Sequence, residues 1–315
     1  MDENFSGKSP DVTATFTPSW LGINWRYASS ILLVHLLALL AFLPSMFSWT
    51  GVVLAVLGQH LYGGIGLNVG YHRLLTHRSF KCPLWFERTL ALLGCCCLEE
   101  SPIIWVAWHR RHHHASDREH DPHSPRESFL WGHIGWLFIE SENSAVELLR
   151  ERYAPDLARD PFMVWLESDD HWIGVVLASW LLYFAVGYGV ATLIGESPAA
   201  AAQFGASLVV WGCFVRTVLV WHVSWSVNSV AHRWGYRNYD TPDDSRNNFV
   251  IGILAGGEGW HNNHHAMPSS ARHGHTWWEF DLAWATIRVF ERLGLITDIK
   301  LPSPDLIGEP ASDNP

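Results

Sequence analysis

The chain has 315 residues, of which 48% are hydrophobic and 17% are charged. Because charged residues make up about a quarter of an average soluble domain, this composition favours a protein with little water-exposed surface. The formal net charge of −10 argues against a nucleic-acid-binding protein, which needs a basic face.

Both ends of the chain are polar. Residues 1–24 lack the basic start and immediate apolar core of a secretory signal, so we expect a flexible N-terminal tail. Residues 301–315 are rich in proline, aspartate and glycine, and we expect a second tail there. The remaining residues, 25–300, are predicted to form one membrane domain.

Four apolar runs between these ends are long enough to span a membrane. A helix of about 20 residues rises about 30 Å, which is the thickness of the hydrocarbon core. Arg216 is the one charged residue inside these runs. Because a charge inside a span is costly, we expect Arg216 to have a functional role, to form an interior ion pair or to snorkel. The four predicted spans are 29–48, 51–70, 172–194 and 199–228.

The distribution of lysine and arginine predicts the orientation. The short turns at 49–50 and 195–198 carry neither residue, whereas the long polar segments carry nearly all of them. The positive-inside rule then places both termini and the long segments in the cytoplasm, with two membrane hairpins. Since 3 lysines stand against 18 arginines, as in GC-rich bacteria, we expect the bacterial inner membrane, with the endoplasmic reticulum as the alternative.

A fifth apolar run, 89–98, would rise only about 15 Å as a helix, too little to cross the membrane. We expect it to dip into the bilayer or to lie at its surface. Five cysteines, three of them adjacent, do not form the pattern of a disulfide framework. Cys95, Cys96 and Cys97 are therefore interpreted as small packing residues.

Nineteen histidines are unusual, and nine of them occur in boxes at the predicted cytoplasmic ends of the spans. The triplets within 109–113 and 261–265 have i, i+3 and i+4 spacing, which places each triplet on one helical face. His72 and His77 lie about 140° apart around an α-helix, so they converge only if the helix ends or bends between them. The nine candidate ligands are His72, His77, His109, His112, His113, His232, His261, His264 and His265.

Nine imidazoles exceed the four ligands of a closed zinc site and suit two metal ions. Imidazole binds iron, zinc, copper and nickel, so the ligand type leaves the metal open. A water on Asn228 is expected to complete one coordination shell, and Asp117 and Glu258 are expected to fix histidine tautomers. The Glu-x-x-His sequence from Glu258 to His261 lacks the second copy that soluble di-iron bundles need, so we interpret it as coincidental.

The order of the boxes resembles that of one known family. His-x4-His at 72–77, Asn-Ser-x-x-His at 228–232 and His-x2-His-His at both 109–113 and 261–265 are similar to the membrane fatty-acid desaturases. The resemblance covers residues 25–300 and is closest to the Δ9 branch, which includes stearoyl-CoA and acyl-lipid desaturases. It implies an all-α integral membrane protein, with four transmembrane helices in two hairpins and a cytosolic helical cap that holds a di-iron site.

The resemblance also implies the chemistry. The nine histidines match the family's ligands for two Fe²⁺ ions, and Asn228 matches a position that holds a metal-bound water. The family uses O₂ to remove two hydrogens from a saturated acyl chain, with electrons from a separate cytochrome b5 or ferredoxin and its reductase. Because an acyl chain offers nothing for an acid, base or nucleophile to act on, we expect no catalytic residues beyond the metal ligands.

Two further sets of residues are candidates for binding roles. Ser224 and Trp225 match a pair near the bend of the family's acyl tunnel. Leu57, Leu61 and Gly64 of the second span are candidates for setting the tunnel's depth, with ordinary helix packing as the alternative. A cationic set is expected to meet a phosphate-bearing carrier, a lipid headgroup or an acidic electron donor, or to be solvated. These cations are Arg73, Lys81, Arg110, Arg111 and Arg118.

The carrier of the acyl chain is left open. Animal acyl-CoA enzymes of the family have Arg-Asp just before the second box, where this chain has Ala107 and Trp108. This departure weakens an acyl-CoA assignment and leaves an acyl-lipid substrate open. Two other functions are considered, a membrane di-iron hydroxylase, which would form an alcohol, and a non-enzymatic metal-binding membrane protein, which would form no product.

Overall fold

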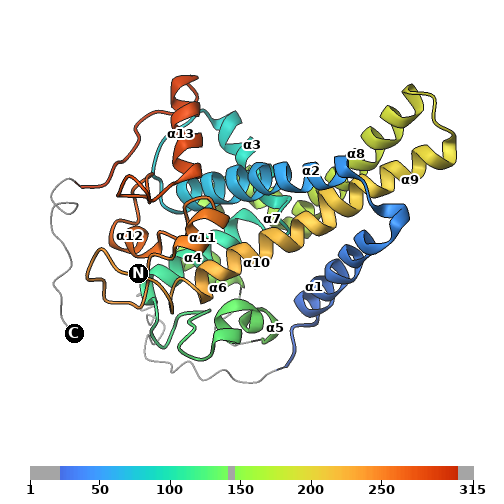
Figure 1. Ribbon diagram of the computed structural model, residues 1–315. Coiled ribbons are helices and arrows are strands. Elements are labelled where there is room, and N and C mark those ends of the chain that lie inside the picture. The colour runs from blue at the N-terminus through green and yellow to red at the C-terminus, as the bar shows by residue number, and fades with distance from the viewer. Residues whose placement is uncertain (1–21, 141–145, 304–315) are drawn as a thin grey trace, which may run out of the picture.

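A computed structural model describes residues 22–140 and 146–303, and in these ranges the chain is helical, with isolated β-bridges but no strand (Figure 1). The all-α prediction is therefore confirmed. The two predicted tails, 1–24 and 301–315, lie almost entirely outside the described residues and stay predictions.

The helices follow the predicted division into two hairpins and a cap. The first hairpin contains α1 (Trp25–Ala38), η1 (Leu39–Phe42), η2 (Pro44–Met46), α2 (Trp49–Gly58) and η3 (Gln59–Thr76). The connecting region contains α3 (Leu84–Cys95), α4 (Pro102–Ala115), η4 (Trp131–Gly135), α5 (Trp136–Phe138), α6 (Val146–Tyr153) and η6 (Leu157–Arg159). The second hairpin contains α7 (Pro161–Glu167), η7 (Ser168–Asp170), α8 (His171–Leu193), α9 (Pro198–Val209), η8 (Val210–Val215) and α10 (Arg216–Ser229). The C-terminal region adds α11 (Phe249–Leu254), α12 (His261–Ala266) and α13 (Leu282–Arg292).

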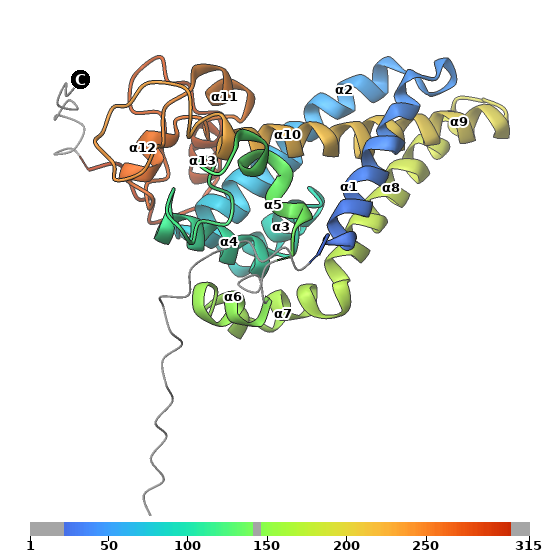
Figure 2. The same cartoon turned by 90° about the horizontal axis from the view of Figure 1, so that it is seen from below.

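Four helical segments, the third of them kinked at Asp169 and Asp170, are long and apolar enough to cross a membrane, and they overlap the four predicted runs. They are Trp25–Phe42, Trp49–Thr76, Pro161–Leu193 and Pro198–Ser229. The last three contain 28, 33 and 32 residues, more than the roughly 20 needed for the hydrocarbon core. Figure 2 shows α11, α12 and α13 gathered at the end of the molecule opposite the α8–α9 turn. The extra length therefore carries the spans into the cap that bears the histidines.

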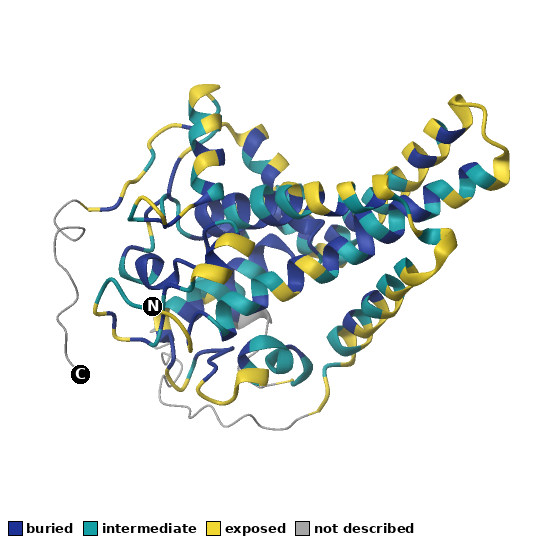
Figure 3. Ribbon diagram, in the orientation of Figure 1, coloured by how far each residue is buried: buried dark blue, intermediate teal, exposed yellow. Residues whose placement is uncertain are grey.

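The outer faces of the spans are apolar. Leu36 of α1 and Leu181 and Leu182 of α8 are each more than half exposed, and exposed residues recur along these helices (Figure 3). Exposed leucines in this number need an apolar solvent, which a bilayer supplies. The chain is a multi-pass membrane protein.

Serine caps set where the second helix of each hairpin begins. The Ser48 hydroxyl accepts a hydrogen bond from the Gly51 N–H (3.0 Å), and the Ser197 hydroxyl accepts one from the Ala200 N–H (3.3 Å). Pro198 follows at the first helical position, where its missing N–H costs nothing. Both hairpin turns are consequently short, and each ends at a helix N-terminus with a hydrogen-bonded serine cap.

The short helix α3 packs closely against η3. A Cβ atom on Gly66 would lie 2.5 Å from the Leu93 carbonyl carbon, and one on Gly94 would lie 2.2 Å from the Tyr71 ring. Both positions therefore require glycine for this close crossing. The helix stops after 12 residues, as expected for a segment too short to cross a membrane.

Arg216 lies in the interior but forms no ion pair with the described residues, so the predicted interior ion pair is wrong. Its Nη1 donates to the Cys96 carbonyl (2.6 Å) at the end of α3, and its guanidinium lies 4.3 Å from the centre of the Tyr62 ring. The Trp221 indole donates to the next carbonyl, that of Cys97 (2.9 Å). These two α10 side chains satisfy the free carbonyls at the C-terminus of α3, where positive charge is favoured.

Candidate metal centre and adjoining cavity

The nine predicted ligands converge at the inner ends of the spans and form two groups. Within each group the potential ligand atoms all lie within 4.8 Å of one another. The five-histidine group contains His72, His77, His109, His113 and His264. The four-histidine group contains His112, His232, His261 and His265. The structure thus brings together the complete set that the sequence predicts.

The triplets of α4 and α12 are each divided between the two groups. The Nε2 atoms of His109 and His113 lie 3.0 Å apart in the five-histidine group, and those of His261 and His265 lie 3.0 Å apart in the four-histidine group. The third histidine of each triplet belongs to the other group. Because neighbouring helical residues differ by about 100°, one short helix can serve two adjacent sites.

His72 and His77 meet at the end of η3, which is wound as a π-helix. In this winding each N–H bonds to the carbonyl five residues earlier, so residues i and i+5 lie on the same face. The His77 N–H donates to the His72 carbonyl (3.2 Å), and the two ring centres are 4.8 Å apart. The expected helix end is present at Thr76, but the sequence did not indicate the π winding that aligns the rings.

Four of the nine histidines have Nδ1 close to a buried carboxylate oxygen, and at His112, His232 and His265 this contact is a hydrogen bond from Nδ1–H. The pairs are His72–Glu258 (2.7 Å), His112–Asp121 (2.9 Å), His232–Asp117 (2.7 Å) and His265–Asp243 (2.8 Å). Each bond fixes the tautomer, so the Nε2 lone pair faces the group. Asp117 and Glu258 were expected from the sequence. Asp121 and Asp243 were missed, because an aspartate in a loop carries no spacing signal.

The tautomers explain why these groups suit a cation. Since His232 and His265 carry their protons on Nδ1, their Nε2 atoms are lone pairs, and both lie 3.0 Å from Nε2 of His261. A proton on His261 could satisfy only one of them, whereas a metal ion could accept all three lone pairs. In the other group, Nε2 of His77 is buried without a hydrogen-bond partner among the described residues. The donor set therefore fits a metal ion in each group.

The electrostatics match this interpretation. Burial, followed by repulsion between neighbouring imidazoles, holds the pKa well below its usual value at His109, His113, His261, His264 and His265. These rings are consequently neutral at pH 7, the form that binds metals. Burial opposes ionisation of Glu258, but the Arg73 guanidinium holds the pKa of this carboxyl well below its usual value. The imidazole ligands are neutral and the neighbouring carboxylates are ionised. The centre therefore carries negative charge that metal cations would balance.

Arg73 ties the first histidine box to the C-terminal region. It is fully buried, and its Nη2 lies 3.0 Å from Glu258 and 2.9 Å from Asp281. Glu258, held in this way, orients His72. His273, which the sequence analysis did not single out, has its Nδ1 3.1 Å from the same carboxylate, and its ring lies 4.5 Å from that of His264.

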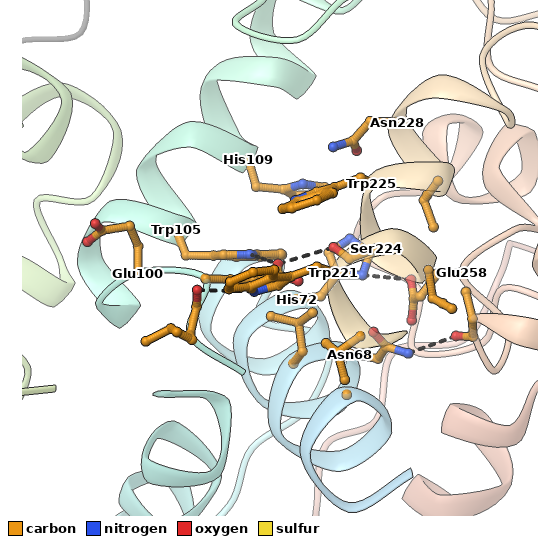
Figure 4. Close-up of a pocket in the computed structure, with 18 of the residues that line it drawn as sticks. Asn68, His72, Glu100, Trp105, His109, Trp221, Ser224, Trp225, Asn228 and Glu258 are labelled. Carbon is orange, nitrogen blue, oxygen red and sulfur yellow. Dashed lines mark hydrogen bonds and ion pairs between the residues drawn. The ribbon is translucent and has the colours of Figure 1, made fainter. Parts of the chain in front are cut away.

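A cavity of about 410 Å³ adjoins the centre, within the range of small-molecule sites. His72, His109, His261 and Asn228 line one part of it. Apolar and aromatic side chains line most of the rest, with Trp105, Trp221 and Trp225 among them (Figure 4). The arrangement is an apolar chamber whose wall includes histidines of both groups.

Comparison with known proteins agrees with the centre and the cavity. Residues 45–295 match the family model described as "Fatty acid desaturase". The chain belongs to the fatty acid desaturase family. It is 43% identical to the sn-1 stearoyl-lipid 9-desaturase of Anabaena variabilis, over 89% of this chain and 94% of the relative. It is 41% identical to the sn-2 palmitoyl-lipid 9-desaturase of Nostoc sp. (strain 36), over 86% and 88%. It is also 43% identical to an acyl-CoA C20 Delta5-desaturase of Anemone leveillei, over 86% and 80%.

The protein is thus a fatty-acyl desaturase, and its predicted tunnel residues divide into two sets. Gly64, Ser224 and Trp225 line the cavity. Leu57 and Leu61 do not; they are 60% and 39% exposed on the outer face of the second span. Neighbouring residues of this span, such as Val56 and His60, line the cavity instead.

The predicted docking cations of the desaturase also divide. Arg73 and Arg111 are buried, the first in its ion pairs and the second with its Nε donating to the His120 carbonyl (3.0 Å). Because both side chains are buried, neither is available at the surface to bind an electron donor or a lipid headgroup. Arg110 is paired with Asp156 (2.6 Å) and Lys81 with Asp298 (2.8 Å), while Arg118 is exposed. The accessible part of the predicted set is therefore Lys81 and Arg118, with Arg110 partly covered.

Proposed function

We propose that this desaturase forms a double bond at position 9 of a saturated acyl chain carried by a membrane lipid, using O₂ at two iron ions. The observation that carries the proposal is the convergence of nine histidines, in two groups, beside one apolar cavity. Two of the relatives are named as acyl-lipid 9-desaturases, and Ala107 and Trp108 replace the Arg-Asp expected of an acyl-CoA enzyme.

The two groups would each hold one iron. The ligands would be the nine histidines, with Asn228, which lines the cavity beside His261, contributing through a water to the four-histidine group. When bound, the iron pair would supply an O₂-derived oxidant strong enough for an unactivated methylene. The balance is one O₂, two electrons and two protons consumed per double bond, with two waters released.

The residues of the chain would position the substrate and the ligands. Carboxylates such as Asp117 and Glu258 would hold the imidazoles in one tautomer, and the apolar walls would exclude water and align one pair of methylenes. Ser224 and Trp225 would form part of this wall, and no side chain is needed as an acid, base or nucleophile. The same wall residues would leave the rest of the acyl chain in an apolar environment.

Electrons would come from a separate donor, cytochrome b5 or ferredoxin with its reductase. Lys81 and Arg118 are the accessible cations for an acidic donor or for a lipid headgroup. We place the protein in the bacterial inner membrane with the cap in the cytoplasm, where a soluble donor can reach it. The endoplasmic reticulum is the alternative location.

The test is expression in a host that lacks its own desaturase, followed by gas chromatography of the fatty acids. The expected product is a 9-monounsaturated chain, located by mass spectrometry of its dimethyl disulfide adduct, and iron near two ions per chain. The His265→Ala variant is the control and should give only saturated chains. An alcohol would favour the hydroxylase alternative, and identical saturated profiles from both proteins, with a competent donor present, would contradict the proposal.

The acyl carrier needs a separate comparison. Purified protein with a reduced donor is supplied with a saturated acyl chain either on a glycerolipid or on coenzyme A. Product from the glycerolipid alone supports the proposed substrate, and product from the acyl-CoA alone contradicts it.

A further inference from the structure

Two adjacent carboxyl groups, Glu99 and Glu100, lie in the wall of the cavity, and Glu99 has the fewer partners. Glu99 belongs to the turn between α3 and α4 and lines the cavity. Its Oε2 accepts hydrogen bonds from the Trp105 indole (3.1 Å) and from the Ser224 hydroxyl (3.1 Å). Its Oε1 is buried and has no hydrogen-bond partner among the described residues.

The backbone of this turn holds Glu99 inward under strain. Leu98 and Glu100 on either side have φ angles of 57° and 95°, which side-chain-bearing residues rarely adopt. The surrounding contacts compensate, because the Trp221 indole donates to the Leu98 carbonyl (3.2 Å) and the Tyr27 hydroxyl donates to the Glu100 carboxylate (2.6 Å). Such strain recurs at ligand-binding sites. These two residues lie in the turn between α3 and α4, and Glu99 between them faces the cavity.

No cation in the described residues compensates a charge on Glu99. From α1, Arg26 is paired with Asp170 (2.6 Å) and lies 3.8 Å from Glu100 instead. From α10, Arg216 is bonded to the Cys96 carbonyl. The same cavity wall contains other titratable groups, which are Tyr27, His60, His72, Glu100, His109, His123, Glu258 and His261. Burial, opposed by the bonds from Trp105 and Ser224, raises the pKa of Glu99 to about 7.

Glu99 is also connected to the metal centre through Trp105. The Trp105 ring stacks on the His109 ring, with centres 5.1 Å apart and planes 14° from parallel. The bond from the Trp105 indole to Glu99 therefore fixes a wall residue that lies flat on a ligand of the five-histidine group. Glu99 is a positioning residue in this respect, because it acts on the ligand through another side chain.

We propose that Glu99 is a protonation-dependent gate for the acyl chain, so that the cavity takes a chain only while this carboxyl is neutral. The inference rests on the proposed function, in which this cavity holds the acyl chain. A neutral carboxyl can lie against methylene groups once its Oε2 is hydrogen-bonded. The entering chain would displace water from an ionised carboxylate, and no cationic side chain pairs with Glu99 to compensate for that water. Acyl binding is consequently weakened as pH rises through the range in which Glu99 ionises.

The experiment measures binding rather than turnover. Full-length protein, purified with its metals in detergent and kept without an electron donor, is titrated with a tritiated saturated C18 acyl glycerolipid between pH 6 and pH 8.5. If the chain binds only the neutral form, the apparent Kd rises by about 30-fold over this interval. Glu99→Gln should bind with nearly the same Kd throughout, because its amide cannot ionise.

Two variants distinguish the gate from a general effect of pH. Glu100→Gln neutralises the adjacent carboxyl, whose two oxygens already have partners, and should retain the pH dependence of the unmodified protein. Ser224→Ala removes one of the hydrogen bonds that favour the ionised form of Glu99, so the midpoint of the binding curve should move to higher pH. The second variant also tests the gate if Glu99→Gln fails to fold.

A pH-independent Kd in the unmodified protein would overturn the gate, as would an unchanged pH dependence in Glu99→Gln together with an unchanged midpoint in Ser224→Ala. In either case the proposed function would stand, because the lipid would still bind. Failure of every variant to bind the lipid at any pH would instead refute both the gate and the proposed use of this cavity.

Discussion

Buried carboxyl groups lie both at the metal end of the cavity and in the α3–α4 turn, but their pKa values are shifted in opposite directions. At the metal end, Asp117 receives a hydrogen bond from His232 and Glu258 is paired with Arg73. These partners hold the pKa of both carboxyls below its usual value even though burial opposes ionisation. At the turn, Glu99 has two neutral donors and no cation, and burial raises its pKa to about 7. The same buried chamber therefore stabilises the ionised carboxylates at the metal end and disfavours ionisation of Glu99 at the turn.

The largest effect is expected from removing a ligand at the metal end. His261→Ala deletes the ring that faces two lone pairs of the four-histidine group, so metal content should fall from about two ions to one or fewer, with loss of desaturation. Metal analysis of the purified protein and fatty-acid chromatography measure the two effects. His114→Ala, at an exposed histidine beside the same boxes, is the control and should change neither. Full metal content in His261→Ala would show that this ring is not a ligand.

Breaking the ion pairs of Arg73 should come next. Glu258→Gln removes the anion between Arg73 and His72 and leaves a fully buried guanidinium with less compensation, which costs about 3–5 kcal/mol for pairs of this kind. A lower thermal melting temperature and weaker metal binding are both expected. Lys81→Gln breaks an exposed pair and should leave the melting temperature nearly unchanged. Equal melting temperatures in the two variants would contradict a stabilising role for the buried pair.

A milder change at the metal end is Asp117→Asn. The amide keeps the shape but loses the charge that holds the His232 Nδ1–H, so metal affinity should fall by about 10–100-fold while the fold persists. Competition with a chelator measures the affinity, and circular dichroism monitors the fold. An unchanged affinity would mean that Asp117 does not orient a ligand.

Glu99, at the α3–α4 turn, should make the unfolding free energy depend on pH. The pKa of Glu99 rises from 4.5 in the unfolded chain to about 7 in the folded one, so the folded state binds more protons between these values. The unfolding free energy should therefore fall as pH rises through this window. Glu99→Gln should remove that loss, so its melting temperature should exceed that of the unmodified protein at pH 8 by more than at pH 5. Glu119→Gln, at an exposed residue, is the control and should show no such difference.

The smallest effects are expected outside the cavity. Leu57→Ala changes an exposed residue of the second span and should leave the chain lengths of the products unaltered. Gly64→Ala, its counterpart in the cavity wall, places a Cβ atom 2.7 Å from Nδ1 of His60, so that ring must move and shorter chains should be favoured. Gas chromatography of the products compares the two variants. A change in product chain length in Leu57→Ala would show that Leu57 contacts the acyl chain after all.

The sequence predicted the spans and the nine converging histidines because both depend on regular spacing. Hydrocarbon thickness fixes the length of the apolar runs, and helical periodicity fixes the triplets of α4 and α12. Features that depend on winding or on distant contacts were not predictable. The π winding of η3 brings His72 to His77, and it has no signature in the residue pattern.

Polar contacts between residues far apart in the chain were also not predictable from the sequence. An interior ion pair was one of the alternatives for Arg216, yet this side chain donates to the Cys96 carbonyl at the end of α3, a helix terminus that becomes its neighbour only after folding. Asp243 and His273 are single polar residues in loops, so nothing in their spacing relates them to the centre. Glu99 was not singled out from the sequence, because the side chains that bond to it come from α4 and α10 and become its neighbours only after folding.

The division of each triplet between the two groups has a consequence for assembly. Because α4 and α12 each contribute rings to both groups, an ion that draws one group together also fixes the helices that carry part of the other. The first ion to arrive thus meets most of the cost of ordering these helices, and the second enters a site already formed. A stepwise metal titration should accordingly pass from empty to doubly loaded protein with few singly loaded molecules in between.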